Sequence, residues 1–443
     1  MRKTIVLIGA GSTVFTPGLL RDFATTTSTD LLDIRLFDIN HEAAEIMARV
    51  GMRLAEKTNS KMTVKAFPDR REALSGADFV TTTIAVGSAP GWLADLKIPE
   101  ELGIYQTVAD SVGPGGVLRS LRHTPALLEI ARDIEQVAPD AIHINYSNPL
   151  TTNVRSIRKY TSVQSVGLCH GTMHTKSAIC ADLGVDPKRV ETVFAGINHL
   201  CWLLDIKLDG EDLYPKLRSL VKTKGGDINS ETNFAEGLHS PVSAKLFETY
   251  GLYPAPGDRH VAEFFGNFLR RHSSGDLKWG LQGGLDMTVQ YIGEKDALWD
   301  ELRAQSEGSA PVDISANQEA ERLVTILEAL ITGKNHMELA VNLPNEGKIS
   351  NLPFNAVVEV PAWIGAAGIN GLSVGALPSA IAAVLTNRAN QQELTIEAAY
   401  EVSREKALQA LVLDPLVGDF DLAVKILDQS IMQDPMHMKG FAS

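Results

Sequence analysis

The chain alternates short β-branched runs with segments of helical periodicity up to about Thr192, and this alternation limits the possible folds most strongly. Strands separated by helices require right-handed crossovers, so they form a parallel sheet with helices on both faces. We therefore predict an α/β fold built on a doubly wound parallel sheet. The expected strands are 4–8, 33–37, 62–67, 79–85, 141–146 and 165–168. The expected helices are 17–26, 41–57, 70–75, 117–137 and 149–160.

Beyond Thr192 the rhythm changes to an α+β pattern, with no repeat and no low-complexity linker. The strand-like pieces here are expected to belong to a different sheet. We predict two tightly fused domains, residues 1–195 and 196–443. In the second domain we expect strands at 193–194, 203–208, 339–342 and 356–360, helices at 240–249, 261–271, 320–332 and 391–412, and a loop at 225–240.

Composition excludes several classes of protein. The 443 residues suffice for two or three domains, and 41 Lys and Arg against 54 Asp and Glu give a net charge of −13. Such an acidic chain is not expected to bind nucleic acid or an anionic membrane. Three cysteines do not make a disulfide framework, and the apolar run at the start is too short for a membrane span. We expect a cytoplasmic protein.

The first predicted strand ends in Gly9-Ala-Gly11, a turn in which glycines let the backbone approach a pyrophosphate at a helix N-terminus. Val14 stands where a third glycine is usual. Asp38 ends the second strand, where a carboxylate accepts hydrogen bonds from a ribose 2′-hydroxyl and so favours NAD over NADP. The alternative is an ordinary tight turn with a surface aspartate. The predicted cofactor residues are Gly9, Gly11, Ser12, Phe15, Asp38 and Asn40, in a Rossmann-like domain.

A thiol and two imidazoles follow the parallel strands. Cys169 and His170 come directly after a predicted strand, and His199 follows about thirty residues later. This spacing does not match a structural zinc site, but one thiolate and one imidazole leave coordination positions open, as in a catalytic metal centre. The alternative is a core cysteine and a satisfied polar histidine.

Three other polar groups lie at predicted strand or helix ends. Asp110 sits in the glycine-rich loop 107–116, Asn148 follows a strand, and Asp258, Arg259 and His260 are adjacent. Each has a structural alternative, namely loop chemistry, an Asx turn or a surface ion pair. Their shared position favours a common site.

Together these motifs resemble glycoside hydrolase family 4. The similarity covers nearly the whole chain, with the motifs in order. The matching segments are Gly9-Ala-Gly-Ser12, Asp38, Asp110-Ser-Val-Gly-Pro-Gly-Gly116, Asn148-Pro149, Cys169-His170, Gly196-Ile-Asn-His199, Val341-Asn-Leu-Pro344, Asn351-Leu-Pro353 and Gly375-Ala-Leu-Pro378.

The resemblance implies a fold related to lactate and malate dehydrogenases, with bound NAD and a divalent metal, usually Mn2+. It implies glycoside hydrolysis outside the usual two-carboxylate scheme. The sugar is oxidised at C3, loses its C2 proton, eliminates the C1 substituent, adds water and is reduced again. The expected partner is a glycoside or small oligosaccharide, and the expected assembly is a homodimer or homotetramer, with the second domain carrying substrate and metal contacts.

The resemblance also assigns roles to individual residues. Metal ligation falls to Cys169 and His199, leaving-group acid to Asp110, leaving-group or substrate contact to His170, base or partner of the base to Asp258, and sugar contact to Asn148. The identity of the base is the most open of these assignments, because branches of the family differ there and some use a tyrosine.

The substrate depends on the branch. His170 after the metal cysteine is similar to branches that use unphosphorylated sugars, and residues 257–264 resemble α-galacturonidases. Gly171 departs from that pattern, because glutamate is expected there and glycine is typical of α-glucosidases and α-glucuronidases. Arg259 could hold a C6 carboxylate through two parallel hydrogen bonds, with His260 as a second donor. Alternatively, Arg259 pairs structurally with Asp258 or Glu263 and does not contact the substrate.

We therefore predict an α-hexuronidase acting on an α-galacturonide or α-glucuronide. An α-galactosidase or α-glucosidase of the same family is the alternative. From a different class, an NAD-dependent dehydrogenase of a sugar acid or malate-like substrate would need only the nucleotide-binding half, and an NAD-sensing regulator is a third possibility.

Overall fold

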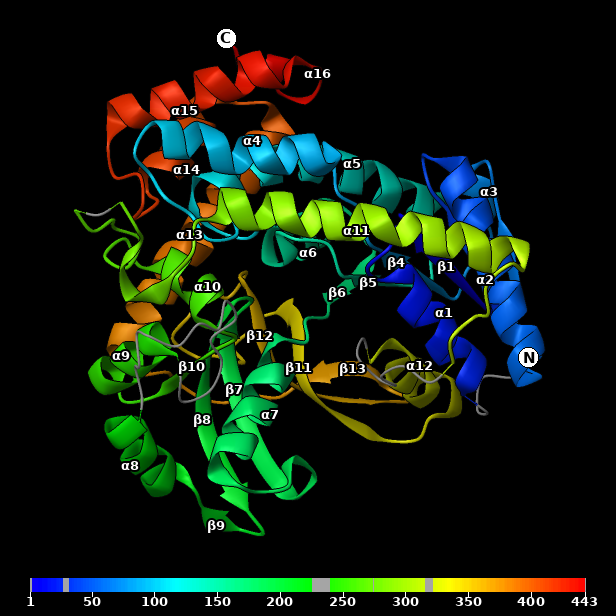
Figure 1. Cartoon of the computed structure of the whole chain (residues 1–443), viewed down its shortest axis with the longest axis horizontal. Helices are drawn as coiled ribbons and strands as arrows, with labels where there is room; N and C mark the ends of the chain where they lie inside the picture. Colours follow the sequence, from blue (N-terminus) through cyan, green and yellow to red (C-terminus); the bar gives the residue numbers. More distant parts are fainter. Residues whose placement is uncertain (1, 27–31, 225–239, 274, 315–321, 443) are drawn as a thin grey trace.

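The computed structural model describes residues 2–26, 32–224, 240–273, 275–314 and 322–442. Six parallel strands run in the order β3-β2-β1-β4-β5-β6, which is the doubly wound Rossmann arrangement (Figure 1). The prediction of this fold is confirmed. The strands are β1 (Lys3–Ile8), β2 (Leu32–Phe37), β3 (Thr63–Ala66), β4 (Phe79–Thr82), β5 (Ile142–Asn145) and β6 (Gln164–Gly167).

Alternate residues of β1 show why the parallel strands are apolar throughout. Ile5 and Leu7 belong to the core cluster that includes residues of α1 and α2, whereas Val6 and Ile8 belong to the cluster that includes residues of α3 and α5. All four are at most 2% exposed, as expected for a strand covered on both faces. The covering helices are α1 (Thr16–Thr25), α2 (His41–Thr58), α3 (Arg70–Leu74), α5 (Gly113–Val137) and α6 (Leu150–Tyr160).

The later strands extend the same sheet, so the prediction of a different sheet is wrong. Antiparallel strands add to the edge strand β6 in the order β11, β12, β7, β8, β10. An open edge strand offers unpaired backbone groups, and β11 pairs with them at Asn342 and Gly167. The predicted boundary between residues 195 and 196 falls inside β7. The bounds are β7 (Val190–Ile197), β8 (Leu200–Leu208), β9 (Glu211–Asp212), β10 (Tyr253–Ala255), β11 (His336–Pro344), β12 (Val357–Gly365) and β13 (Gly368–Gly371).

Two predicted helices need correction. The segment 261–271 forms only α10 (Asp258–Val261) and the 3-10 turn η3 (Ala262–Phe264), after which Gly266 packs so closely on Pro415 that a Cβ would lie 2.4 Å from its carbonyl oxygen. The segment 391–412 is not one helix, because α13 ends before Val402, which has φ 55°. The next helix, α14, begins at Arg404. The predicted loop 225–240 lies outside the described residues except for its last residue.

The remaining helices lie mainly around the antiparallel half and on top of the molecule (Figure 1). Among the described residues, no helix is long and apolar enough to cross a membrane. These helices are α4 (Ser88–Glu101), α7 (Gly171–Leu183), η1 (Pro187–Arg189), α8 (Tyr214–Lys224), α9 (Pro241–Tyr250), η4 (Lys278–Gly280), α11 (Gly284–Glu307), α12 (Leu323–Thr332), α13 (Ser379–Glu401), α14 (Arg404–Val412), α15 (Phe420–Gln433), α16 (Pro435–Met438) and η5 (Lys439–Ala442).

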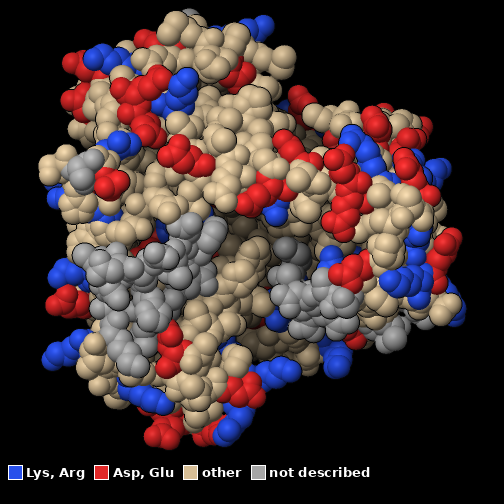
Figure 2. Space-filling model, viewed as in Figure 1, with Lys and Arg blue, Asp and Glu red and all other residues tan. Residues whose placement is uncertain are grey.

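The sheet therefore places its parallel carboxyl ends beside the antiparallel half. The space-filling view shows a hollow near the middle of the face that α11 crosses, with acidic and basic side chains interspersed around it (Figure 2). Ligands of doubly wound folds bind outside the carboxyl ends of the strands, so this edge is where a site is expected.

Candidate active site

The glycine loop after β1 is tightly closed onto Asp38. Gly9 has φ 84°, and a Cβ on it would lie 2.9 Å from the backbone of Thr83. The backbone N–H of Gly11 donates to one carboxylate oxygen of Asp38 at 2.8 Å, and the N–H of Asn40 donates to the other at 2.8 Å. The side chain of Asn40 caps α2 by accepting from the N–H of Ala43. A carboxylate thus fixes the loop at the N-terminal end of α1.

Cys169 and His199 come from two different connections and meet at the carboxyl edge. Cys169 follows β6 and precedes α7, while His199 occupies the two-residue turn between β7 and β8 with φ 66°. The hairpin closes so tightly that a Cβ on Gly196 would lie 2.2 Å from the carbonyl oxygen of Leu200. The side chains of Cys169 and His199 line the same pocket. The structure thus brings these two predicted residues together.

The imidazole of His199 lies between Cys169 and Asp110. Burial alone would raise the pKa of the Cys169 thiol, but the neighbouring imidazole of His199 outweighs this effect and lowers that pKa. Burial likewise opposes the charge on His199, yet Asp110 and Cys169 raise the pKa of the imidazole well above its usual value. On its other side, Nδ1 of His199 lies 2.9 Å from Ser111 Oγ and 3.5 Å from an oxygen of Asp110.

The carboxylate of Asp110 belongs to this network of hydrogen bonds around His199. Its carboxylate accepts from Asn148 Nδ2 at 2.7 Å and from Ser111 Oγ at 2.8 Å. Burial favours the neutral acid, but the charges of His199, His260 and Arg119 prevail and lower the pKa of Asp110. A carboxyl group held ionised is a poor proton donor, so the acid role does not follow from this geometry and stays a prediction.

A pocket of about 450 Å3 joins six of the eight residues predicted for catalysis, substrate and metal, whereas Asp110 and Asn148 are not in its lining. The ring of His260 lies 4.1 Å from that of His199, measured between centroids. The predicted neighbour Asp258 is 2% exposed, and its carboxylate accepts from the N–H groups of Val242 and Ser243 at the start of α9. The pocket is lined by Cys169, His170, Gly171, His174, His199, Pro256, Gly257, Asp258, Arg259 and His260.

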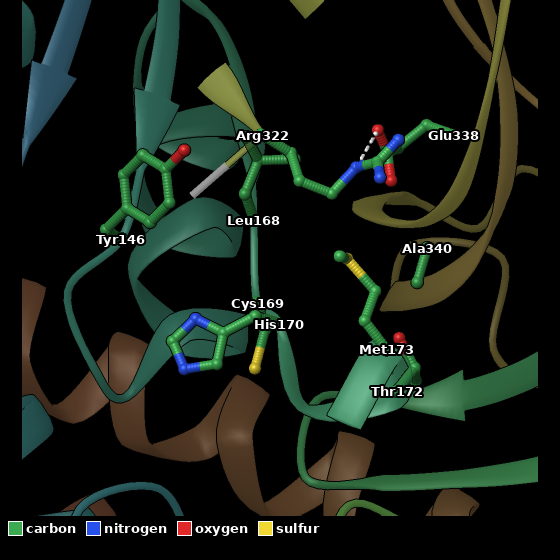
Figure 3. A pocket seen from close by; sticks show the side chains of 9 residues that line it. All are labelled: Tyr146, Leu168, Cys169, His170, Thr172, Met173, Arg322, Glu338 and Ala340. Carbon is green, nitrogen blue, oxygen red and sulfur yellow. Dashed lines mark hydrogen bonds and ion pairs between the residues drawn. The ribbon is translucent and has the colours of Figure 1, made fainter. Parts of the chain in front are cut away.

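A smaller cavity adjoins this pocket at Cys169 and His170 (Figure 3). The ring of Tyr146 lines it and also packs on Phe15 of the glycine loop, with the ring centroids 5.6 Å apart. The ion pair of Arg322 with Glu338 lies across from Cys169. Tyr146 therefore connects the glycine loop after β1 to the cavity beside Cys169.

Sequence analysis missed several residues of this site. Ser111 contacts His199, and Arg119 Nε donates to the carbonyl oxygen of Asn148 at 3.0 Å. Glu263 accepts three backbone hydrogen bonds in the loop before Asp110. The signal for Glu263 was a single acid inside the apolar run 261–265, since a buried acid needs partners. His174 gave no comparable signal.

Comparison with known proteins finds matches over both halves of the chain. Residues 4–185 match the model of "Family 4 glycosyl hydrolase", and residues 194–417 match that of "Family 4 glycosyl hydrolase C-terminal domain". An alpha-galactosidase of Bacillus subtilis (strain 168) is 33% identical over 414 residues, covering 93% of each chain. An alpha-galacturonidase of the same organism is 32% identical over 449 residues, covering 97% of each chain.

Solved structures give the same picture of the fold. A putative glucosidase lplD from Bacillus subtilis superposes with a TM-score of 0.86 at 29% identity, covering 97% of this chain and 99% of that one. A 6-phospho-alpha-glucosidase from gut microorganisms, solved in complex with NAD and Mn2+, superposes with a TM-score of 0.85 at 24% identity, covering 99% of each chain.

Proposed function

Because the chain belongs to family 4 of the glycosyl hydrolases, we propose that it is an NAD- and metal-dependent enzyme that cleaves the α-glycosidic bond of an unphosphorylated α-hexuronide. The family itself and the α-glycosidase activity follow from the relatives. The uronide is our own inference. Membership also favours a hydrolase over the alternatives of a dehydrogenase or a regulator.

The glycine loop fits NAD. Gly9 and Gly11 have no room for side chains, which leaves their backbone facing the start of α1, where a pyrophosphate binds. Asp38 is positioned to accept from a ribose hydroxyl, and Ile39 beside it is 96% exposed and offers an apolar surface to an adenine ring. When bound, NAD supplies the acceptor and donor of hydride. Tyr146 links this loop to the cavity beside Cys169.

The residues around His199 fit a divalent cation. Cys169 supplies a thiolate, and Nδ1 of His199 is engaged by Ser111, which leaves Nε2 as a ligand. Asp110, His199 and His260 also present ligand atoms within 4.8 Å of one another. Cys169 and His199 would hold a divalent cation here, and when bound it would supply an electrophile for the sugar oxygens.

The protein side chains would then orient the sugar and move its protons. Asn148 donates to Asp110 in the structure, and both are candidates for contact with sugar hydroxyls. His170, before α7, lines both cavities and is the candidate for leaving-group contact. Asp258 is the candidate base, because burial raises its pKa to about 6, which suits proton transfer near neutral pH. Its hydrogen bonds to α9 would hold the carboxylate at the pocket wall.

The observation that favours a uronide is a guanidinium in the pocket lining. One arginine, Arg259, lines the pocket, and the aspartate beside it, Asp258, binds the N-terminus of α9 through its carboxylate oxygens. Such a lining favours a carboxylate at C6 over a hydroxymethyl group. Packing explains why residue 171 is a glycine, because a Cβ there would lie 2.6 Å from Pro256. The departure from the glutamate of the α-galacturonidase pattern thus has a steric cause.

A substrate panel tests this proposal. With NAD+, Mn2+ and a thiol reductant, we expect the protein to cleave p-nitrophenyl α-galacturonide or α-glucuronide faster than the corresponding α-galactoside and α-glucoside. The 6-phosphorylated glucoside is the further comparison, because a phosphate is also an anion. Faster cleavage of the neutral hexosides would contradict the uronide and favour the α-galactosidase alternative, to which the 33% identical relative points.

A further inference from the structure

We propose that Glu263 is a positioning residue that fixes Asp110 and Arg259 relative to His199, an inference that rests on the proposed function. Glu263 lies in η3 and is 1% exposed, so water does not satisfy its carboxylate. It does not line the pocket, and its influence on the sugar must therefore pass through other residues.

The carboxylate of Glu263 organises the loop that leads to Asp110. One oxygen, Oε1, accepts from three consecutive backbone N–H groups, those of Thr107, Val108 and Ala109, at 2.8, 2.7 and 2.9 Å. Ala109 has φ 59°, a left-handed conformation that an alanine adopts only when its surroundings impose it. Successive N–H groups that converge in this way form a concavity that binds an acceptor oxygen, and here the protein supplies that oxygen itself.

The same loop continues to the metal site. Asp110 follows Ala109 directly, and Ser111 Oγ lies 2.9 Å from Nδ1 of His199. A displacement of the loop would thus change the position of the Asp110 carboxylate and the hydrogen bond that orients the His199 ring. Orientation of a metal-binding histidine by its second nitrogen commonly governs metal affinity.

Arg259 is tied to the loop by a reciprocal pair of hydrogen bonds. Its Nη2 donates to the carbonyl oxygen of Thr107 at 2.9 Å, and the hydroxyl of Thr107 donates back to the carbonyl oxygen of Arg259. Glu263 lies one turn beyond Arg259, so both ends of the segment 259–263 form hydrogen bonds with residues 107–109. The position of the proposed carboxylate-binding guanidinium is therefore tied to the loop that carries Asp110.

Glu263 is itself anchored from the C-terminal helices. Arg388 of α13 donates to the carbonyl oxygen of Glu263 at 2.8 Å and also to the carboxylate of Asp414. Arg388 and Asp414 are at most 1% exposed. A buried, charge-assisted anchor of this kind leaves η3 little freedom to shift. The carboxylate of Glu263 is therefore held in place to accept the three N–H groups of the loop.

Substitutions of Glu263 separate the acceptor from the charge. A glutamine side chain keeps an oxygen at the position of Oε1, so for Glu263→Gln we expect kcat within about fivefold of the wild type, because a neutral hydrogen bond is weaker than a charge-assisted one but has similar geometry. Glu263→Ala removes the acceptor, and we expect kcat on the uronide to fall about 100-fold, the usual consequence of a misplacement near 1 Å. Glu263→Asp, with a shorter reach, should lie between them.

Two readouts distinguish positioning from general destabilisation. In a double-mutant cycle with Asp110→Asn, the losses from Glu263→Ala and Asp110→Asn should not add, because both disturb one unit. Mn2+ binding measured by titration calorimetry should weaken for Glu263→Ala and recover for Glu263→Gln. The control is Asp95→Asn, which removes another buried carboxylate, paired with Arg122, and should lower thermal stability without changing Mn2+ affinity.

A fully additive cycle, or Mn2+ binding and kcat unchanged in folded Glu263→Ala, would overturn the proposal. If Glu263→Ala does not fold, a Glu263→Asp variant with wild-type kcat and Mn2+ affinity would overturn it equally. Failure of the wild type to cleave any glycoside would instead count against the proposed function, so the two failures can be told apart.

Discussion

Cys169→Ser is expected to lose glycoside cleavage by on the order of 10³-fold, which corresponds to about 4 kcal/mol of transition-state stabilisation. The reason lies in the network around His199. The imidazole of His199 lowers the pKa of the Cys169 thiol, which prepares a thiolate ligand. A serine hydroxyl does not ionise in this range and binds divalent metals poorly, so the proposed metal site would lose one of its ligands.

The loss should be specific to the metal. NAD binding, followed by protein fluorescence or calorimetry, should remain near the wild-type affinity, because the glycine loop lies on a separate connection. A chelator should reproduce the loss in the wild type, and added Mn2+ should reverse it. Cys180→Ser is the matched control, since Cys180 is another free thiol, buried within α7 and outside the pocket. Wild-type activity of Cys169→Ser, or full activity in excess chelator, would contradict the metal site.

Arg259→Lys is expected to produce the second large effect, confined to uronides. Lysine keeps the charge but not the planar pair of donors that matches a carboxylate. Leaving a desolvated carboxylate poorly paired costs about 2–5 kcal/mol, so kcat/KM for the uronide should fall by roughly 30-fold to several thousand-fold. Kinetics with p-nitrophenyl α-hexuronides provide the measurement.

The hexosides provide the internal control for this substitution. Arg259 also donates to the carbonyl oxygen of Thr107, so a disturbed loop would slow uronides and hexosides alike. A selective loss on uronides would support carboxylate binding, whereas equal losses on both substrates would assign Arg259 a purely structural role. Arg271→Lys is the matched control, because Arg271 pairs with Glu100 on the surface and should leave both activities unchanged.

The parallel half of the fold could be predicted because its local pattern and its packing agree. The last four residues of β1, Ile5 to Ile8, are each buried on one face or the other, which produces an unbroken apolar run that periodicity detects. The antiparallel half could not be predicted as part of the same sheet. Its pairing with β6 depends on a contact between Asn342 and Gly167, which are far apart in the sequence, and no local pattern records such a contact.

The candidate site divides in the same way. Cys169 and Asp38 stand at strand ends, where topology alone brings ligand-binding groups together, so their position at this edge of the sheet could be predicted. Glu263 was missed because its role depends on three N–H groups more than 150 residues earlier in the chain. Asp258 was expected at the pocket and lines it, but its hydrogen bonds to the start of α9 became apparent only in three dimensions.

We expect cleavage to proceed through temporary oxidation of the sugar and loss of its C2 proton, chemistry that would use both the glycine loop and the Cys169–His199 pair. The most direct test is turnover of the preferred glycoside in deuterium oxide with NAD+ and Mn2+, followed by NMR of the released sugar. We predict deuterium at C2 and no net accumulation of NADH. A product without deuterium at C2 would indicate direct displacement at C1 and would contradict this account.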